Sequence, residues 1–158
     1  MGRTRLSGLA NLLRSTVGVL FHVEHYDKEA LSSMFSFIDG YDLLFALSNR
    51  SDGNMRLTGE FDRDADAMKN RLSFLRAHDI PTDNILRASL VHGQSVAKVT
   101  THQRGKILEN TDGLITDDAD VFLTITVADC LPIILFDPDL QRLALIHAGW
   151  RGLALDIL

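Results

Sequence analysis

Cysteine and histidine are residue types that often bind metal ions in proteins. Cys130 and His147 lie on either side of an Asp-Pro-Asp turn in the segment ADCLPIILFDPDLQRLALIHAGWRG. The apolar runs on each side of the turn have the length of strands, and proline followed by aspartate suits the centre of a type I turn. A hairpin centred on Pro138-Asp139 would place Cys130 directly opposite His147, with Cβ atoms about 4.5–5.5 Å apart. At that separation, a thiolate and an imidazole can bind the same metal ion.

A third ligand is needed for such a site, and the segment ASLVHGQSV supplies a candidate in His92. His92 ends an apolar run and precedes Gly93, at a junction between a strand and a turn. His22 and His25 are poorer candidates, because side chains three residues apart on a strand point to opposite faces. A structural alternative stays open from the pattern alone, since a lone cysteine in an apolar region is more often a small core residue.

Two imidazoles and one thiolate form a ligand set that leaves the fourth position of a tetrahedral zinc ion open, as in catalytic zinc sites. Zinc in such a site lowers the pKa of a bound water to about 7. The same ligand types also occur in blue-copper centres, which use a weak axial methionine. No methionine follows Cys130 or His147 in the sequence. The pattern therefore favours zinc over copper.

The elements that would position these residues are a mixture of helices and strands. Residues 27–38 and 62–78 show helical spacing of apolar residues, and Met68, Leu72 and Leu75 line one face of the second helix. An apolar run in DGYDLLFALS predicts a strand, and further β-rich runs lie at 85–91, 95–100, 121–127, 132–137 and 142–148. The last two runs are apolar on both alternations, as expected of strands covered on both faces. The expected fold is α+β, with mixed, largely antiparallel β-sheets, flanking helices and a metal site at strand ends.

Three segments resemble a known family: LVHGQSV, DGLITDDADVFLTITVADCLPIILFD and LALIHAGWRG. They are similar to the proteins described as multicopper polyphenol oxidases or laccase-domain proteins, whose members are also described as purine nucleoside phosphorylases with adenosine deaminase activity. The resemblance runs from about Leu44 to the end of the chain, and its ADC-P and HAGWRG elements are very specific. It implies that His92, Cys130 and His147 bind the catalytic metal ion.

Some features depart from the usual pattern of this family. The segment FALSNRSDGNM keeps Ser48 and Asn54 but lacks the glycine pair of the family's Gly-Gly-Val-Ser element. Relatives continue well beyond the GWRG helix, so residues 1–158 are expected to form a single laccase-domain-type unit without the C-terminal part of the family domain. An ordinary laccase mechanism is not expected, because a trinuclear copper cluster needs several His-x-His pairs and the six histidines here form none.

Residues near these motifs are candidates for contact with a substrate. Asp129 precedes the thiol and could contact a substrate, orient a ligand histidine or cap a turn. The segment GWRGLALDIL predicts a helix whose first N–H groups, together with Arg151, would bind phosphate, although a structural salt bridge suits Arg151 equally well. Trp150 could stack on a purine or belong to the core. Asn49 and Arg50, in a turn-rich loop, are weaker candidates for contact with ribose or phosphate.

The resemblance implies a zinc-dependent enzyme of purine nucleosides. It would cleave adenosine, inosine and methylthioadenosine with phosphate to the free base and ribose 1-phosphate, and would also deaminate adenosine. Two other classes stay open. One is a metal-independent cysteine hydrolase, with Cys130 as nucleophile and His147 as base. The other is an inactive fragment that binds a metal ion or a partner.

The composition limits the partners and the compartment. The chain has 158 residues, close to one domain, and its formal net charge of −5 argues against a general nucleic-acid binder. No apolar run approaches the roughly 18 residues of a membrane span, and Arg14 interrupts the apolar part of the N-terminal segment, unlike in a signal peptide. A single cysteine cannot form an internal disulfide. We therefore expect a cytoplasmic protein whose partners are a purine nucleoside and phosphate, and not nucleic acid or a membrane.

Overall fold

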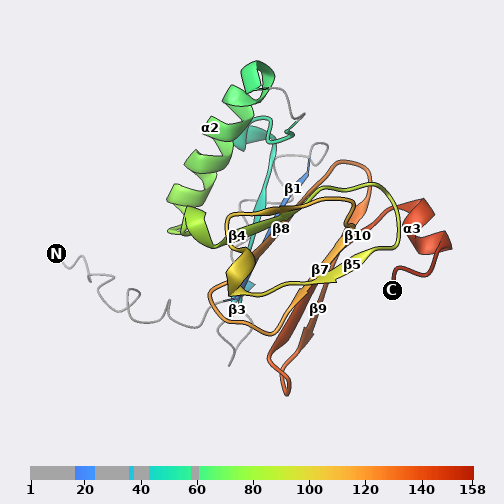
Figure 1. The fold of residues 1–158 in the computed structure, drawn as a ribbon. Helices are drawn as coiled ribbons and strands as arrows, with labels where there is room; N and C mark the ends of the chain where they lie inside the picture. The colour runs from blue at the N-terminus through green and yellow to red at the C-terminus, as the bar shows by residue number, and fades with distance from the viewer. Residues whose placement is uncertain (1–16, 24–35, 38–42, 58–60) are drawn as a thin grey trace.

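The computed structural model describes residues 17–23, 36–37, 43–57 and 61–158, which form strands, two α-helices and short 3-10 helices (Figure 1). The strands are β1 Val17–Val23, β2 Ser36–Phe37, β3 Leu43–Ser48, β4 Ile85–Ala88, β5 Val96–Lys98, β6 Ile107–Leu108, β7 Gly113–Thr116, β8 Phe122–Val127, β9 Leu131–Asp137 and β10 Arg142–Ala148. The helices are η1 Arg50–Asp52, α2 Phe61–Ala77, η2 Thr82–Asn84, η3 Thr101–Gln103 and α3 Trp150–Ala154. No helix among the described residues is long and apolar enough to cross a membrane.

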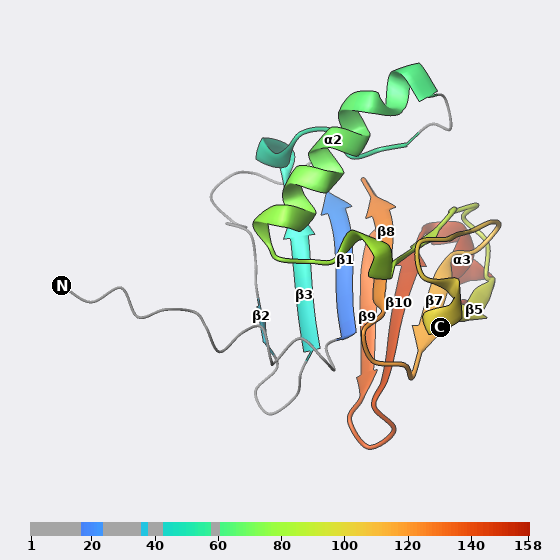
Figure 2. The ribbon, with the colours of Figure 1, turned by 60° about the vertical axis from the view of Figure 1, so that its left-hand side comes forward.

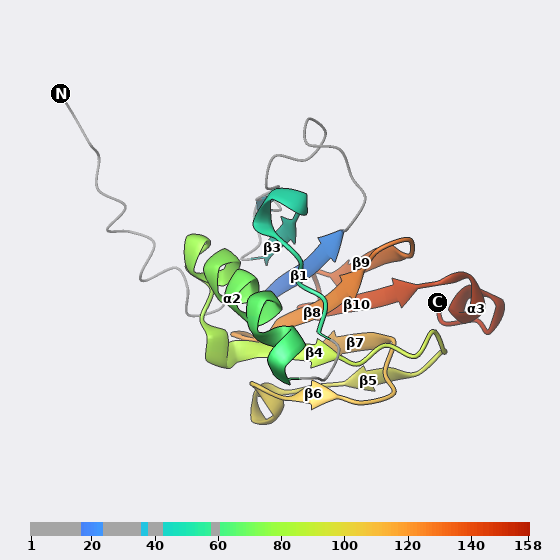
Figure 3. The same cartoon turned by 90° about the horizontal axis from the view of Figure 1, so that it is seen from above.

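The strands form two sheets, and α2 covers one of them. The six-stranded sheet has the order β2-β3-β1-β8-β4-β6, and the four-stranded sheet has the order β5-β7-β10-β9. Figure 2 shows α2 lying across the six-stranded sheet. Seen from above, α3 lies at the far end of β10, away from α2 (Figure 3).

Side-chain alternation along β8 connects the layers. Leu123, Ile125 and Val127 belong to the core between the two sheets, which also contains Leu114, Leu143 and Leu145 of the four-stranded sheet. Phe122 lies on the opposite face and packs in a second core with Phe74 and Leu75 of α2. Because successive side chains of a strand point to opposite faces, one strand contributes to both cores.

The expected α+β class with mixed sheets is confirmed, but the balance of strand directions differs from the expectation. In the six-stranded sheet β1 pairs in parallel with β3 and β8, and β4 pairs in parallel with β6 and β8. Antiparallel pairs predominate only in the four-stranded sheet, where β10 pairs with β7 and β9. The apolar pattern of a buried strand does not encode its direction, so the parallel pairs were missed.

The helix predicted for 62–78 is confirmed as α2, but its predicted apolar face is only partly buried. Ala67 and Phe74 are buried with Leu75, whereas Met68 is exposed at the rim of a cavity. The helix predicted for 27–38 lies mostly outside the described residues. Its last described residues, Ser36–Phe37, form strand β2 and pair with β3, so the prediction is wrong there.

The β9–β10 hairpin is confirmed, but only β10 is covered on both faces. Residues Leu143–Ala148 of β10 are buried, while β9 lies at the edge of its sheet and exposes Leu131 by 60% and Leu135 by 51%. Apolar residues on both alternations of β9 therefore do not mean that both of its faces are buried. An edge strand has a neighbour on one side only.

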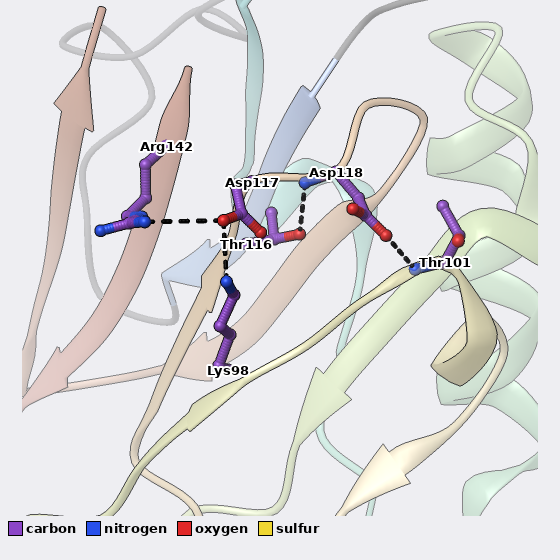
Figure 4. A network of polar contacts seen from close by, with 6 residues as sticks. All are labelled: Lys98, Thr101, Thr116, Asp117, Asp118 and Arg142. Atoms are coloured by element: carbon purple, nitrogen blue, oxygen red, sulfur yellow. Dashed lines mark hydrogen bonds and ion pairs between the residues drawn. The ribbon is translucent and has the colours of Figure 1, made fainter. Parts of the chain in front are cut away.

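A polar network holds the end of the four-stranded sheet at which β10 begins (Figure 4). The carboxylate of Asp117 lies 2.8 Å from Lys98 Nζ and 3.5 Å from Arg142 Nη2. The next residue, Asp118, accepts a hydrogen bond of 2.8 Å from the backbone N–H of Thr101. These contacts join β5 and β10 to the chain that follows β7, at the end of the sheet opposite to His147.

Candidate metal centre

The structure brings together the three residues that the sequence pattern singled out. The ligand atoms of His92, Cys130 and His147 all lie within 4.8 Å of one another. The two imidazole rings meet edge to face, with centroids 4.8 Å apart and an interplanar angle of 85°. His147 is 3% exposed, Cys130 is half-buried and His92 is exposed. We call these three residues the metal centre.

The topology explains why residues so far apart in sequence converge. The chain passes from the six-stranded to the four-stranded sheet three times, between β4 and β5, between β6 and β7, and between β8 and β9. The first and the last of these connections carry His92 and Cys130. Since β4 and β8 are parallel neighbours, both connections leave from the same end of the sheet. β10 pairs antiparallel with β9 and ends there as well, which brings His147 to the same place.

The predicted register of the hairpin is wrong by two residues. His147 pairs with Pro132, and Ala148 pairs with Leu131, so Cys130 lies one step beyond the ladder rather than opposite His147. The turn is longer than predicted, because the Asp137 carboxylate accepts the N–H groups of both Asp139 and Leu140 at 3.0 Å. A shift of two residues preserves the face to which a side chain points. The thiol and the imidazole therefore still converge.

A buried carboxylate that the sequence analysis did not identify, Asp112, organises two of the three ligands. Its Oδ1 accepts the backbone N–H of His92 at 2.8 Å and lies 3.0 Å from Nδ1 of His147. Its Oδ2 accepts the N–H of Gly93 at 2.8 Å. These bonds hold His92 at a positive φ of 60°, a conformation that is uncommon outside glycine. Strand β4 ends at Ala88, three residues before the end of the predicted β-rich run at residue 91.

Asp112 is fully buried, with 0% of its side chain exposed, yet its environment favours the charged form. Burial acts to raise the pKa of this carboxyl, but the hydrogen bonds from the Gly93 N–H, the His147 ring and the His92 N–H outweigh it and lower the pKa below its ordinary value. An ionised Asp112 that accepts the proton on Nδ1 of His147 leaves Nε2 of that ring for a metal ion. A carboxylate–histidine pair of this kind commonly orients metal ligands. The sequence offered Asp129 as one candidate for this role, and the structure places Asp112 there instead.

The metal centre forms part of the wall of a cavity of about 450 Å³. Leu90, Val127 and Ala128 are apolar residues of the cavity wall, and Asp129 lines the cavity as an exposed carboxylate. Arg56, Arg71 and Arg87 line it as well. A volume of this size lies within the range of about 300–1,000 Å³ that is usual for pockets that bind small molecules.

The other predicted contact residues lie elsewhere. Arg151 is exposed, and its guanidinium stacks 5.2 Å from the ring of Trp150, which is itself 74% exposed. Asn49 caps η1, with Oδ1 accepting the N–H of Ser51 at 2.8 Å, and Arg50 is an exposed residue of that short helix. None of these residues is among those that line the cavity of the metal centre. The core alternative for Trp150 is therefore wrong.

The sequence contains a feature that could have identified Asp112 as a site residue, but almost none that could have identified the arginines of the cavity. Asp112 precedes Gly113 at the start of an apolar run in a segment that resembles the family. The first residue of a buried strand is an unusual place for a carboxylate. Arg71 and Arg87 stand within a helix and a strand that look amphipathic, where a charged residue normally faces solvent. Only the packing of α2 on β4 and β8 shows that they face a cavity.

Gly149 lies directly against the metal centre, which leaves little space for a side chain at this position. A Cβ atom built on Gly149 would lie 3.2 Å from Cys130 Sγ and 3.4 Å from His92 Cδ2. Its backbone angles, φ −80° and ψ 158°, suit alanine, so Gly149→Ala should fold normally. We expect zinc affinity to fall by about tenfold or more as the ligands are displaced, measured by competition with a chelating dye. Leu153→Ala, an exposed position on α3, is the control, and equal affinities of the two variants would contradict this prediction.

The sequence is similar to a known family and to several named proteins. Residues 49–158 match the family model described as multi-copper polyphenol oxidoreductase laccase. The chain is 36% identical over 98 residues to "Purine nucleoside phosphorylase YlmD" of Bacillus subtilis, a match that spans 58% of this chain and 35% of that protein. It is also 36% identical over 108 residues to the protein of the same name from Geobacillus stearothermophilus, with 64% of this chain and 39% of that protein covered.

Solved structures show the same fold. The crystal structure of YlmD from Geobacillus stearothermophilus superposes with a TM-score of 0.60 at 36% identity, covering 66% of this chain and 41% of that one. A Bacillus licheniformis hypothetical protein, YfiH, gives a TM-score of 0.59 at 29% identity, with the same coverage. The matched part thus spans well under half the length of these relatives. The family match covers most of the chain, and the chain belongs to the multi-copper polyphenol oxidoreductase laccase family.

Proposed function

We propose that this chain carries the metal centre of a zinc-dependent purine nucleoside phosphorylase. The reaction is phosphorolysis of adenosine, inosine and methylthioadenosine to the free base and ribose 1-phosphate, with deamination of adenosine as a second activity of the same cavity. We place the enzyme in the cytoplasm, with residues 1–158 as one laccase-domain-type unit. The observation that carries the proposal is the convergence of His92, Cys130 and His147 within 4.8 Å on the wall of a cavity of about 450 Å³.

The donor set fits zinc better than copper. Two imidazoles and a thiolate are the ligand types of catalytic zinc sites with an open position. No methionine is among the residues that line the cavity, so the described surroundings offer no axial thioether of the blue-copper kind. Asp112 provides the carboxylate that such sites use to fix the tautomer of a ligand histidine.

The residues in and around the metal centre would have different roles in the proposed reaction. A zinc ion held by the metal centre would supply Lewis-acid chemistry and lower the pKa of a coordinated water. Asp112 holds the proton on Nδ1 of His147 and fixes the His92 loop, so that both rings keep one orientation. Asp129 presents an exposed carboxylate on the cavity wall, where it can accept a hydrogen bond from a hydroxyl or amine of the nucleoside.

Products from adenosine test this proposal directly. Zinc-loaded protein should release adenine only when phosphate is present, and should form inosine with or without phosphate, because deamination uses water as the nucleophile. Chromatography of adenine, hypoxanthine, adenosine and inosine separates the two activities. His92→Ala, which removes one ligand, should lose deamination. Absence of any product from zinc-loaded protein would overturn the proposal.

A cysteine hydrolase is the second candidate, because the geometry offers a Cys–His–Asp series. Cys130 and His147 lie within 4.8 Å of each other, and Nδ1 of His147 bonds to Asp112, as in enzymes whose cysteine is activated by a neighbouring base. The position of His92 against both residues favours the metal centre instead. The hydrolase would keep its activity after exhaustive chelation, whereas the phosphorylase would lose its activity and regain it with zinc.

A further inference from the structure

The cavity of the metal centre is strongly basic although the chain as a whole is acidic. The formal net charge of the chain is −5. Arg56, Arg71 and Arg87 all line the cavity, and Asp129 is the only carboxylate among its lining residues. A local excess of positive charge in an acidic protein is the electrostatic signature of a site that attracts an anionic ligand.

Arg71 is held rigidly at this cavity by two hydrogen bonds. It projects from α2, donating through Nε to the backbone oxygen of Met55 at 2.7 Å and through Nη2 to Oγ1 of Thr126 at 2.6 Å. Thr126 belongs to β8, four residues before Cys130. The two bonds fix the plane of the guanidinium and engage only part of its donor set. A planar guanidinium fixed in this way is suited to bidentate recognition of an oxyanion.

Arg87 completes a pair with Arg71. It lies on β4, next to β8 in the sheet, and both arginines line two adjoining cavities: that of the metal centre and an apolar one of about 270 Å³ beneath α2. The two arginines therefore lie where the cavities meet. Burial and then the charge of Arg87 lower the pKa of Arg71 to about 10, with Asp64 opposing this effect. Arg71 stays cationic at neutral pH, and an anion beside it would reduce the repulsion between the two cations.

The helix after the metal centre is a weaker place for an anion. α3 spans only Trp150–Ala154, and Arg151 is exposed over the Trp150 ring. Its guanidinium lies outside the described cavity wall, whereas Arg71 and Arg87 share a cavity with His92, Cys130 and His147. The anion that a phosphorolytic reaction requires must reach the same cavity as the nucleoside.

We propose that Arg71 and Arg87 form the binding site for inorganic phosphate, with Arg56 at its exposed rim, in place of Arg151 and the start of α3. This inference rests on the proposed phosphorolysis for its role in the reaction, but the anion site itself stands on the geometry of the arginines. Phosphate bound there would lie on the α2 side of the cavity, and the nucleoside between it and the metal centre.

Calorimetric titration with inorganic phosphate, without nucleoside, tests the site independently of turnover. Metal-free and zinc-loaded protein are both titrated, so that binding at the metal ion is distinguished from binding at the arginines. We expect Arg87→Met to weaken phosphate binding at least tenfold. Arg71→Lys should also weaken it, because lysine keeps the charge but loses the planar fork. Zinc content should stay unchanged in both variants, which also shows that they fold.

Two arginines provide controls. Arg76→Ala alters an exposed residue of the same helix, and Arg151→Ala removes the competing candidate, and both should bind phosphate like the unmodified protein. Loss of phosphate binding in Arg151→Ala with full binding in Arg87→Met would overturn the inference even if phosphorolysis is observed. Phosphate binding that depends on Arg71 and Arg87 in a protein that releases no adenine would instead refute the proposed function and leave the anion site standing.

Discussion

Replacing Cys130 by alanine should abolish the zinc binding that we propose while leaving the fold intact. The substitution deletes the one thiolate of the metal centre and leaves two imidazoles, of which His92 is exposed. Cys130 is half-buried at the junction between β8 and β9, outside both cores, so truncation should change the stability of metal-free protein by about 1 kcal/mol or less. The measurement is zinc per chain after gel filtration, with the circular dichroism spectrum as a check on the fold.

The neighbouring residue supplies a matched control for this experiment. Asp129 is exposed on the wall of the same cavity but is not one of the three converging ligands, so Asp129→Ala should retain its zinc. One zinc ion per chain in the Cys130→Ala protein would show that Cys130 is not a ligand. Loss of zinc from the Asp129 variant, with zinc retained in the Cys130 variant, would show that Asp129 and not Cys130 supports metal binding.

Replacing Asp112 by asparagine should destabilise the protein more than the replacement of any of the three residues of the metal centre. The carboxylate is fully buried and accepts N–H groups of His92 and Gly93 and the Nδ1 proton of His147. In asparagine one oxygen becomes an amide donor, which would face these donors without accepting from them. The loss of charged, buried hydrogen bonds should lower the free energy of unfolding of the metal-free protein by about 3 kcal/mol. Urea denaturation measures this change.

The same substitution should also weaken zinc binding. Without the carboxylate, the positive φ of His92 loses its support and the His147 ring loses the partner that fixes its tautomer. Loss of such a partner typically costs about 10–100-fold in metal affinity. Asp129→Asn, which alters an exposed carboxylate on the cavity of the metal centre, should change the free energy of unfolding by no more than about 0.5 kcal/mol and the zinc affinity by little. An Asp112→Asn protein as stable as the parent would remove the organising role that we assign to this residue.

The sequence by itself determined the chemistry of the metal centre and several of the elements that carry it. His92, Cys130 and His147 were identified from residue type, from their places at the ends of apolar runs and from a specific resemblance, and the structure brings the three together. Helix α2 and the hairpin of β9 and β10 were also predictable, since each depends on a periodicity within a few consecutive turns or residues. These features are local, and local patterns record them.

The tertiary structure alone decided how the elements are joined and what faces the cavity. Strand β1, which pairs with both β3 and β8, was not predicted, because parallel pairing depends on segments far apart in the chain. The register of the hairpin depended on hydrogen bonds to Asp137 that lengthen the turn. Asp112 and the arginines acquired their roles through the connections between the two sheets and the packing of α2. The sequence gives the type of each side chain. The groups that a side chain contacts depend on which strands, far apart in the sequence, become neighbours in the fold.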